Sequence, residues 1–353
     1  MEKNRKRKRK IILAALLFTS LLLTGCSKIN RDTKIVLTTG FTKDEVFRIE
    51  TASCYKKEVM VYLTNLQNRY EQVYGTEIWG KEQAGVTFEQ SIKESVLAEL
   101  AQIKTMNLMA EKYNISLDEV EQDAINEAAN VYFDSLTGEE KDALGVTLDT
   151  IRQLYREYAI ADKVYDYMIK DVNPEISDDE ARTVVVQQIL IRFSGQGSAE
   201  EADISDQQKS YALARAKEAL KRIEAGEDFD VVATRYNEAE ESTISIRKGD
   251  MDAACEEAAF GLGGEEISDI IETPEGYYIL KCVSTLNREE TELNKVKIVE
   301  ARKKEAFSRE YDSFVQTLTR HVNEGLWKEI TLLHDSNITT SDFFEVFAEY
   351  YGK

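Results

Sequence analysis

Apolar side chains recur every three or four positions over much of the first half of this chain. This spacing places them on one face of an α-helix, so it predicts amphipathic helices. The predicted helices cover residues 43–70, 87–113, 117–133 and 148–169. The first should begin at the capping-box pattern Thr42-Lys43-Asp44-Glu45. Asn173-Pro174 ends the series, because proline disfavours helical geometry in the preceding residue. Residues 35–172 are therefore predicted to form a helical module.

The pattern changes after residue 177. A nearly continuous β-branched run at Val184–Ile191 predicts a buried strand, and Tyr277–Val283 predicts a second one. Three helices are predicted between these strands, at residues 211–225, 229–236 and 254–260. This mixture favours a compact α+β domain over residues 178–286.

A charged helix with an apolar stripe is predicted for residues 289–324, followed by a short strand at 326–333. The last segment, residues 343–351, is an aromatic helix that we expect to pack on the N-terminal module. The predicted fold class is therefore α+β. Residues 35–172 and a C-terminal helical segment, 288–353, form a helical module, and the α+β domain is inserted between them.

The N-terminus has the order of an export signal. Basic residues fill much of the first ten positions, and an apolar run follows from Ile11 to Leu23. At about 1.5 Å per residue this run covers roughly 20 Å, less than the ~30 Å hydrocarbon core, so it is too short for a permanent span. Leu23-Thr24-Gly25-Cys26 resembles the lipobox of bacterial lipoproteins. That resemblance implies cleavage after residue 25, lipid attachment to Cys26, and a tether at residues 26–34 on the extracytoplasmic face of the cell membrane. An ordinary signal peptide is the alternative.

Charge and composition narrow the chemistry. The formal net charge of −20 becomes −26 without residues 1–25, which hold seven bases and one acid (38 basic and 64 acidic residues remain). Such a chain repels phosphates, so no nucleic-acid partner is expected. Besides Cys26 there are Cys54, Cys255 and Cys282, with no CxxC spacing, and we expect no disulfide. Because the only histidines are His321 and His334, we expect no metal site and no cofactor.

Residues 180–286 resemble a parvulin-type peptidyl-prolyl isomerase domain. Six blocks in the family's order carry this resemblance. They are Gln188-Ile189-Leu190; the run from Ala216 to Ala233 with Gly226 and Phe229; Lys248-Gly249-Asp250-Met251; Glu256-Glu257-Ala258-Ala259-Phe260; Glu266-Ile267-Ser268; and Thr273-Pro274-Glu275-Gly276-Tyr277-Tyr278. The layout resembles the PrsA-like and SurA-like foldases of the bacterial envelope.

The pocket positions depart from the family pattern. Gln188 and Tyr278 stand where parvulins carry histidines, and Cys255 replaces the aromatic residue that contacts the substrate proline. The expected cysteine or aspartate falls near Ala239. Met251 is expected in the core rather than against substrate. We expect Gln188 and Tyr278 to face each other and form a hydrogen bond, and we identify no catalytic residue.

The resemblance implies a membrane-anchored chaperone or foldase that binds unfolded exported polypeptides, with weak or no isomerase activity. One alternative is an active prolyl isomerase with a rebuilt pocket, because bond rotation moves no proton between substrate and enzyme. A weaker alternative is a structural or assembly lipoprotein. The sequence identifies no client, and it leaves a homodimer open.

Overall fold

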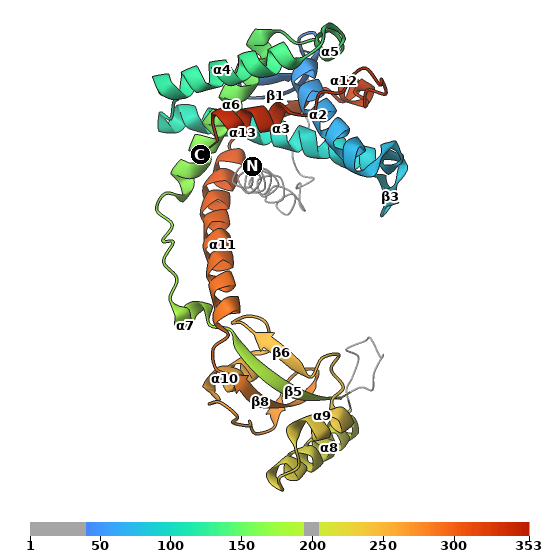
Figure 1. The fold of residues 1–353 in the computed structure, drawn as a ribbon, viewed down its shortest axis with the longest axis vertical. Helices are drawn as coiled ribbons and strands as arrows, with labels where there is room; N and C mark the ends of the chain where they lie inside the picture. The colour runs from blue at the N-terminus through green and yellow to red at the C-terminus, as the bar shows by residue number, and fades with distance from the viewer. Residues whose placement is uncertain (1–39, 194–204, 353) are drawn as a thin grey trace, which may run out of the picture. The chain divides into compact units, whose positions relative to one another are not determined.

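The computed structural model describes residues 40–193 and 205–352. The predicted signal segment and Cys26 lie outside the described residues. The described chain is α+β and forms two compact units (Figure 1). Residues 40–170 and 307–352 make the first unit, and residues 171–193 and 205–306 make the second.

Helices dominate the first unit. They are α2 (Lys56–Tyr74), the short 3₁₀ helix η1 (Thr76–Gly80), α3 (Phe88–Tyr113), α4 (Glu119–Ser135), α5 (Gly138–Leu144), α6 (Leu148–Ile169), α12 (Glu324–Glu329) and α13 (Phe343–Tyr350). The helices predicted over 87–113, 117–133 and 148–169 are confirmed as α3, α4 and α6. Each begins at a side-chain cap, on Thr87, Asp118 and Thr147 respectively.

The helix predicted from residue 43 is wrong over its first part. Residues 45–55 instead form a hairpin of β1 (Glu45–Ile49) and β2 (Ala52–Tyr55), and β9 (Arg320–Val322) pairs with β1 on its other side. Asp44 and Glu50 adopt φ angles of 63° and 50°, which a right-handed helix does not contain. A second hairpin, β3 (Glu82–Gln83) and β4 (Val86–Thr87), precedes α3.

Two predictions for the C-terminal segment are also wrong. The long helix predicted to reach residue 324 is α11 (Arg288–Val315), and the chain then turns so that β9 can pair with β1. The strand predicted at 326–333 is wrong, because residues 324–329 form α12.

The C-terminal helix α13 packs into the core of the first unit. Phe343 is 1 % exposed, and its ring centroid lies 5.4 Å from that of Tyr62, 5.2 Å from Tyr132 and 4.4 Å from Tyr155. The Tyr155 hydroxyl donates to the Phe343 carbonyl at 2.7 Å. Residues at the two ends of this unit's sequence therefore share one core.

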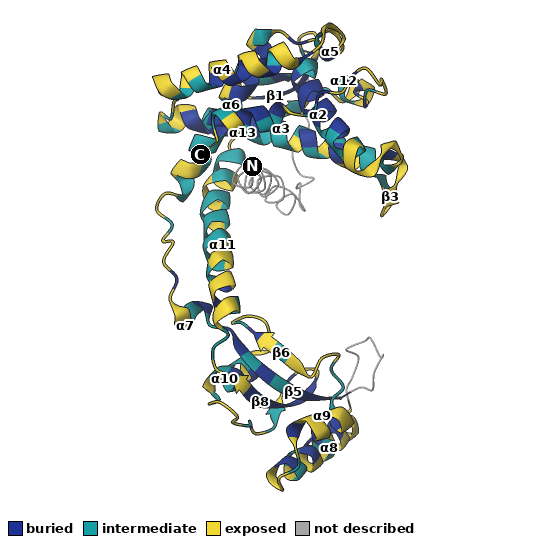
Figure 2. Ribbon diagram, viewed as in Figure 1, coloured by how far each residue is buried: buried dark blue, intermediate teal, exposed yellow. Residues whose placement is uncertain are grey.

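The second unit is built on a four-stranded antiparallel sheet, in the order β6 (Thr243–Ile246), β5 (Val184–Arg192), β8 (Gly276–Ser284) and β7 (Ile271–Glu272). Its helices are α7 (Asp178–Ala181), α8 (Asp206–Glu224), α9 (Phe229–Tyr236), α10 (Ala253–Gly261) and the first part of α11. Helices α8 and α9 cover one face and α10 packs on the other. Figure 2 shows the buried residues of β5 and β8 in dark blue.

The predicted strands at 184–191 and 277–283 are confirmed as β5 and β8, and the helices predicted between them as α8, α9 and α10. Helix α8 begins five residues earlier than predicted, because Ser205 caps it. Within the described residues, no helix combines the length and the apolar character that a membrane span needs.

Candidate functional site

The pocket positions of the second unit lie on the sheet face that α10 covers. Gln188 on β5 pairs with Leu280, and Tyr278 on β8 pairs with Leu190. Cross-strand partners share a face, as do residues two apart on a strand, so Gln188 and Tyr278 lie on the same face. Cys255 of α10 and Met251, which precedes that helix, belong to the cluster on this face. The structure therefore brings the four predicted positions together.

The predicted hydrogen bond between Gln188 and Tyr278 is wrong. The Gln188 side chain is 6 % exposed, and its Nε2 donates to the Glu241 carbonyl at 2.8 Å. The backbone amide of Gln188 donates to the Ser242 carbonyl, also at 2.8 Å. Gln188 thus holds the connection between α9 and β6 against β5, because backbone and side chain both bind that segment.

Asn237 and Glu238 are part of this connection, and no pattern of residues indicated their role. Asn237 Oδ1 accepts the backbone amide of Leu190 at 2.9 Å, and Glu238 Oε2 accepts that of Arg192 at 2.8 Å. The strand β6 does not extend far enough to pair with these two amides, so the side chains replace it as acceptors. Ala239, near which the family's cysteine or aspartate was expected, donates its own backbone amide to Asn237 Oδ1 at 3.1 Å.

Tyr278 is bound to a carboxylate. Its hydroxyl, in a side chain that is 6 % exposed, donates to Glu275 Oε1, and Arg192 Nη1 lies 2.6 Å from Glu275 Oε2. Burial and this hydrogen bond both raise the pKa of Tyr278 above its usual value, so the phenol stays protonated at neutral pH. Glu275 belongs to the turn before β8, and only the folded chain shows that it reaches Tyr278.

Cys255 and Met251, the two sulfur-containing residues among the pocket positions, differ in how far their side chains are exposed to solvent. Cys255 is fully buried, and burial, with the charges of Asp252 and Glu275, raises the pKa of its thiol to about 12. This thiol is protonated at neutral pH and is a poor nucleophile. Met251 is half-buried and packs against the edge of the same cluster, so it lies less deep than the predicted core position. Cys282 is also a buried free thiol.

These contacts limit which groups on the sheet face under α10 can bind a substrate. A catalyst of prolyl rotation must surround the imide and hold the ring while the C–N bond twists. Here the amide of Gln188 and the hydroxyl of Tyr278 are already bound within the protein, and the Cys255 position offers no exposed surface. Met251 is the one of the four that retains substantial exposed surface. Gln188 and Tyr278 are therefore engaged in hydrogen bonds within the domain, and Cys255 is buried in it.

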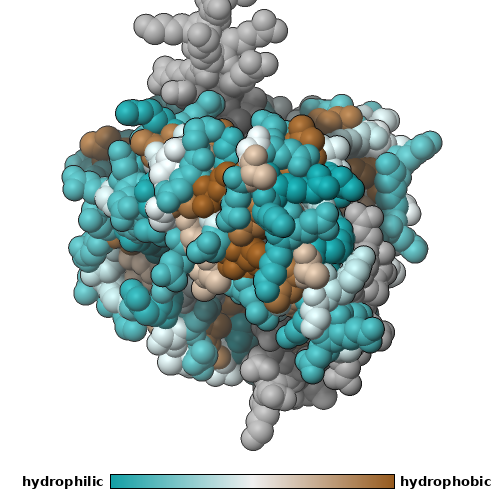
Figure 3. Space-filling model, turned by 90° about the horizontal axis from the view of Figure 1, so that it is seen from below, coloured by the Kyte–Doolittle hydropathy of each residue, from teal (hydrophilic) through white to brown (hydrophobic). Residues whose placement is uncertain are grey.

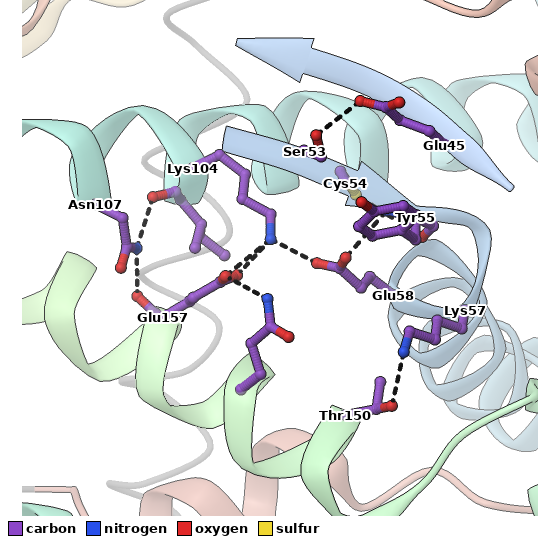
Figure 4. Close-up of polar contacts among 12 residues, drawn as sticks. Glu45, Ser53, Cys54, Tyr55, Lys57, Glu58, Lys104, Asn107, Thr150 and Glu157 are labelled. Atoms are coloured by element: carbon purple, nitrogen blue, oxygen red, sulfur yellow. Dashed lines mark hydrogen bonds and ion pairs between the residues drawn. The ribbon is translucent and has the colours of Figure 1, made fainter. Parts of the chain in front are cut away.

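A second polar cluster lies inside the first unit. Lys104 on α3 is 2 % exposed, and its Nζ lies 2.6 Å from Glu58 Oε2 of α2 and 2.7 Å from Glu157 Oε2 of α6. Figure 4 shows the ammonium group between the two carboxylates. Burial alone would lower the pKa of Lys104, but the charges of Glu157 and Glu58 outweigh it and raise that pKa. Burial raises the pKa of Glu58.

This cluster connects three helices and does not resemble a catalytic centre. Asn107 donates to the Glu157 carbonyl at 2.9 Å, and Glu58 Oε1 accepts the Tyr55 amide at 3.0 Å. The nearby thiol of Cys54 is fully buried, and burial raises its pKa well above the usual value. Nowhere in residues 40–193 and 205–352 do three or more His, Cys, Asp or Glu side chains gather as metal ligands would.

Comparison with known proteins agrees with the sequence resemblance. Residues 189–284 match the model of the rotamase family, described as the PPIC-type PPIase domain. The chain is 26 % identical over 220 residues to foldase protein PrsA of Halalkalibacterium halodurans, which covers 58 % of this chain and 62 % of that protein. It is 23 % identical over 286 residues to foldase protein PrsA of Caldanaerobacter subterraneus, covering 75 % of this chain and 80 % of the relative.

Among solved structures, the peptidylprolyl isomerase PrsA of Bacillus cereus aligns with 86 % of this chain and 98 % of its own, at 16 % identity and a TM-score of 0.34. The prediction of a parvulin-type domain in a PrsA-like chain is confirmed by the family match and the two relatives.

Proposed function

We propose that this chain is a chaperone of the PrsA-like kind, which binds unfolded exported polypeptides outside the cytoplasmic membrane while tethered through a lipid on Cys26. The domain match at residues 189–284 and the similarity to two PrsA foldases support a role in protein folding. The location rests on the basic and apolar N-terminus followed by Leu23-Thr24-Gly25-Cys26.

We further propose that the parvulin domain contributes binding or scaffolding rather than fast isomerisation. One observation carries this proposal: the Gln188 amide and the Tyr278 hydroxyl, which stand at the family's histidine positions, are bound to Glu241 and Glu275. Using either group on a substrate requires an existing buried hydrogen bond to break, and such an exchange costs free energy.

An active isomerase is the second candidate, and Met251 favours it. This half-buried side chain lies on the face where the family holds its substrate, and a thioether can contact a proline ring. Since the reaction needs no proton transfer, loss of both histidines does not by itself abolish it.

A chaperone that binds many unrelated unfolded polypeptides needs apolar side chains that are exposed to solvent and arranged in several small patches. Val73 and Tyr74 at the end of α2 are 71 % and 64 % exposed, and Tyr211 on α8 is 68 % exposed. On the face drawn in Figure 3, hydrophobic residues form small brown groups separated by hydrophilic ones. Small patches of this kind suit weak, reversible contacts with extended chains.

Light scattering of a chemically denatured client protein, diluted into buffer with and without the purified chain, tests the proposal. We expect the chain to slow aggregation at roughly equimolar ratio and the client to remain soluble. The double variant Val73→Ser with Tyr74→Ser should protect less well, and Glu77→Ser, a nearby exposed polar position, serves as the control that should protect like the unmodified chain. Aggregation at the same rate with and without the unmodified chain would contradict the proposal.

A further inference from the structure

A cleft of about 300 Å³ opens on the first unit between α4 and α6. The two helices lie side by side, and two contacts between them show that they run antiparallel (Figure 1). Arg152 contacts Asn130 across them at 3.1 Å, and Lys163 lies 2.6 Å from Glu121. Leu117 and Ile125, both largely buried, form the apolar part of the cleft lining. An apolar side chain of a bound ligand can therefore be buried in this cleft.

Two arginines one helical turn apart line the other side of this cleft. Arg152 Nη1 lies 3.2 Å from Asp149 Oδ1, and its Nε is buried without an acceptor. Arg156 is exposed and forms neither a hydrogen bond nor an ion pair with any residue in the described part of the chain. Because Asp149 is already paired with Arg152, the cleft retains one uncompensated positive charge.

This positive charge contrasts with the rest of the chain, which is strongly acidic and has a formal net charge of −20. An acidic surface repels carboxylates in general. A guanidinium group without a partner, beside an apolar lining, is therefore a site where a carboxylate can bind selectively. The planar guanidinium group can also bind both oxygens of a carboxylate at once. Asn126 lies in the same lining, and its amide matches the hydrogen-bonding groups of an extended backbone.

We propose that the cleft between α4 and α6 binds a carboxylate of an extended polypeptide through Arg156, with the neighbouring apolar side chain against Leu117 and Ile125. This site deepens the proposed chaperone function, on which it rests, by giving the bound segment a chemical class: an acidic group next to an aliphatic residue. The carboxylate has two sources, an Asp or Glu side chain or the C-terminus of the polypeptide.

Calorimetric titration of the purified chain with three short peptides tests this site. The first is Ac-Ala-Leu-Glu-Leu-Ala-NH2, the second has Gln in place of Glu, and the third has this Gln but ends in a free carboxylate. We expect the Glu peptide to bind about tenfold more tightly than the amidated Gln peptide, as for one charge-assisted contact. Tight binding of the third peptide would assign the site to chain termini.

Two substitutions at one position make the test specific. Arg156→Gln should remove the preference for the acidic peptide, and Arg156→Glu should replace it with a preference for a Lys peptide. Arg320→Gln, which removes the same charge from exposed β9 of the same unit, should leave binding unchanged. Equal binding of the Glu and both Gln peptides by the unmodified chain, or an unchanged preference in Arg156→Gln, would overturn the proposal.

The peptide titration and the aggregation assay together show whether the cleft proposal or the chaperone proposal fails. If the chain suppresses aggregation but shows no preference for any carboxylate peptide, the cleft proposal fails and the chaperone proposal stands. If the peptides bind as expected but aggregation proceeds unchanged, the cleft is a binding site and the chaperone proposal fails.

Discussion

Two carboxyl groups of the first unit are held in opposite electrostatic environments. Glu45 is buried beside the Arg48 guanidinium at 2.6 Å and accepts further hydrogen bonds from Ser53 and Thr42, which together hold its pKa at about 2. Glu99 is half-buried near Tyr62 and Tyr158, and burial raises its pKa to about 7. The two residues therefore couple stability to pH in different ranges.

Glu99 should make the first unit less stable as pH rises towards neutrality. Its folded pKa of about 7 exceeds the unfolded value of 4.5, so its contribution is fully present below pH 4.5 and is lost as pH rises through 7. Glu99→Gln should remove up to about 3 kcal/mol of this dependence, at about 1.4 kcal/mol per pKa unit. Urea unfolding at pH 4.5 and 7.5 measures it.

The matched control is Glu94→Gln, an exposed position on the same helix. This variant should retain the pH dependence of the unmodified chain. The same loss of stability between pH 4.5 and 7.5 in Glu99→Gln as in the unmodified chain would show that Glu99 does not titrate in this range.

At the residue scale, the sequence identified the pocket positions but not their partners. One face of the sheet carries Gln188, Met251, Cys255 and Tyr278. For Gln188 and Tyr278 this was predictable, because alternate residues of a strand point to the same face. Their hydrogen bonds depend on where loops lie. The acceptor for Gln188 is a carbonyl in the connection before β6, and no periodic pattern predicts its position.

At the element scale, long amphipathic helices were predictable and short paired strands were not. Helices α3, α4 and α6 each combine a cap residue with several turns of regular apolar spacing. In contrast, β1 is five residues long and its partner β9 lies about 270 positions later in the chain. Local sequence cannot reveal such a pairing, because its stability comes from the distant strand.

Helix α13 should contribute strongly to the stability of the first unit through Phe343. This ring is 1 % exposed among Tyr62, Tyr132 and Tyr155, so Phe343→Ala leaves a cavity that the surrounding rings cannot fill. We expect a loss of about 3–5 kcal/mol in the free energy of unfolding, measured with urea. Glu349→Ala, exposed on the same helix, should change it by less than about 0.5 kcal/mol. Similar values for both variants would contradict the packing described for α13.

At the scale of the whole molecule, the proposed tether sets where the chain acts. Expressed in full in a bacterial host, the chain should be recovered with the membrane fraction, and mass spectrometry should find diacylglycerol on an N-terminal Cys26. Cys26→Ser should release it from that fraction, because the sulfur that carries the lipid is absent. Membrane recovery that survives this substitution would contradict lipid anchoring through Cys26.

In the proposed function, the parvulin-type domain serves a chaperone while its pocket groups are bound within the domain itself. Gln188 and Tyr278 carry that claim through their hydrogen bonds to Glu241 and Glu275. If either group acted on substrate, its removal would slow the reaction, whereas groups with a structural role would change stability instead.

Exchange NMR on labelled Ala-X-Pro peptides, with the chain from Ser27 onward, measures whether the parvulin-type domain catalyses prolyl isomerisation. A parvulin that retains both histidines serves as the positive control. We predict cis/trans exchange at the rate of the free peptide, with line broadening where the peptide binds. Accelerated exchange that disappears in Gln188→Ala and Tyr278→Ala variants with unchanged stability would contradict the account and identify an isomerase with a rebuilt pocket.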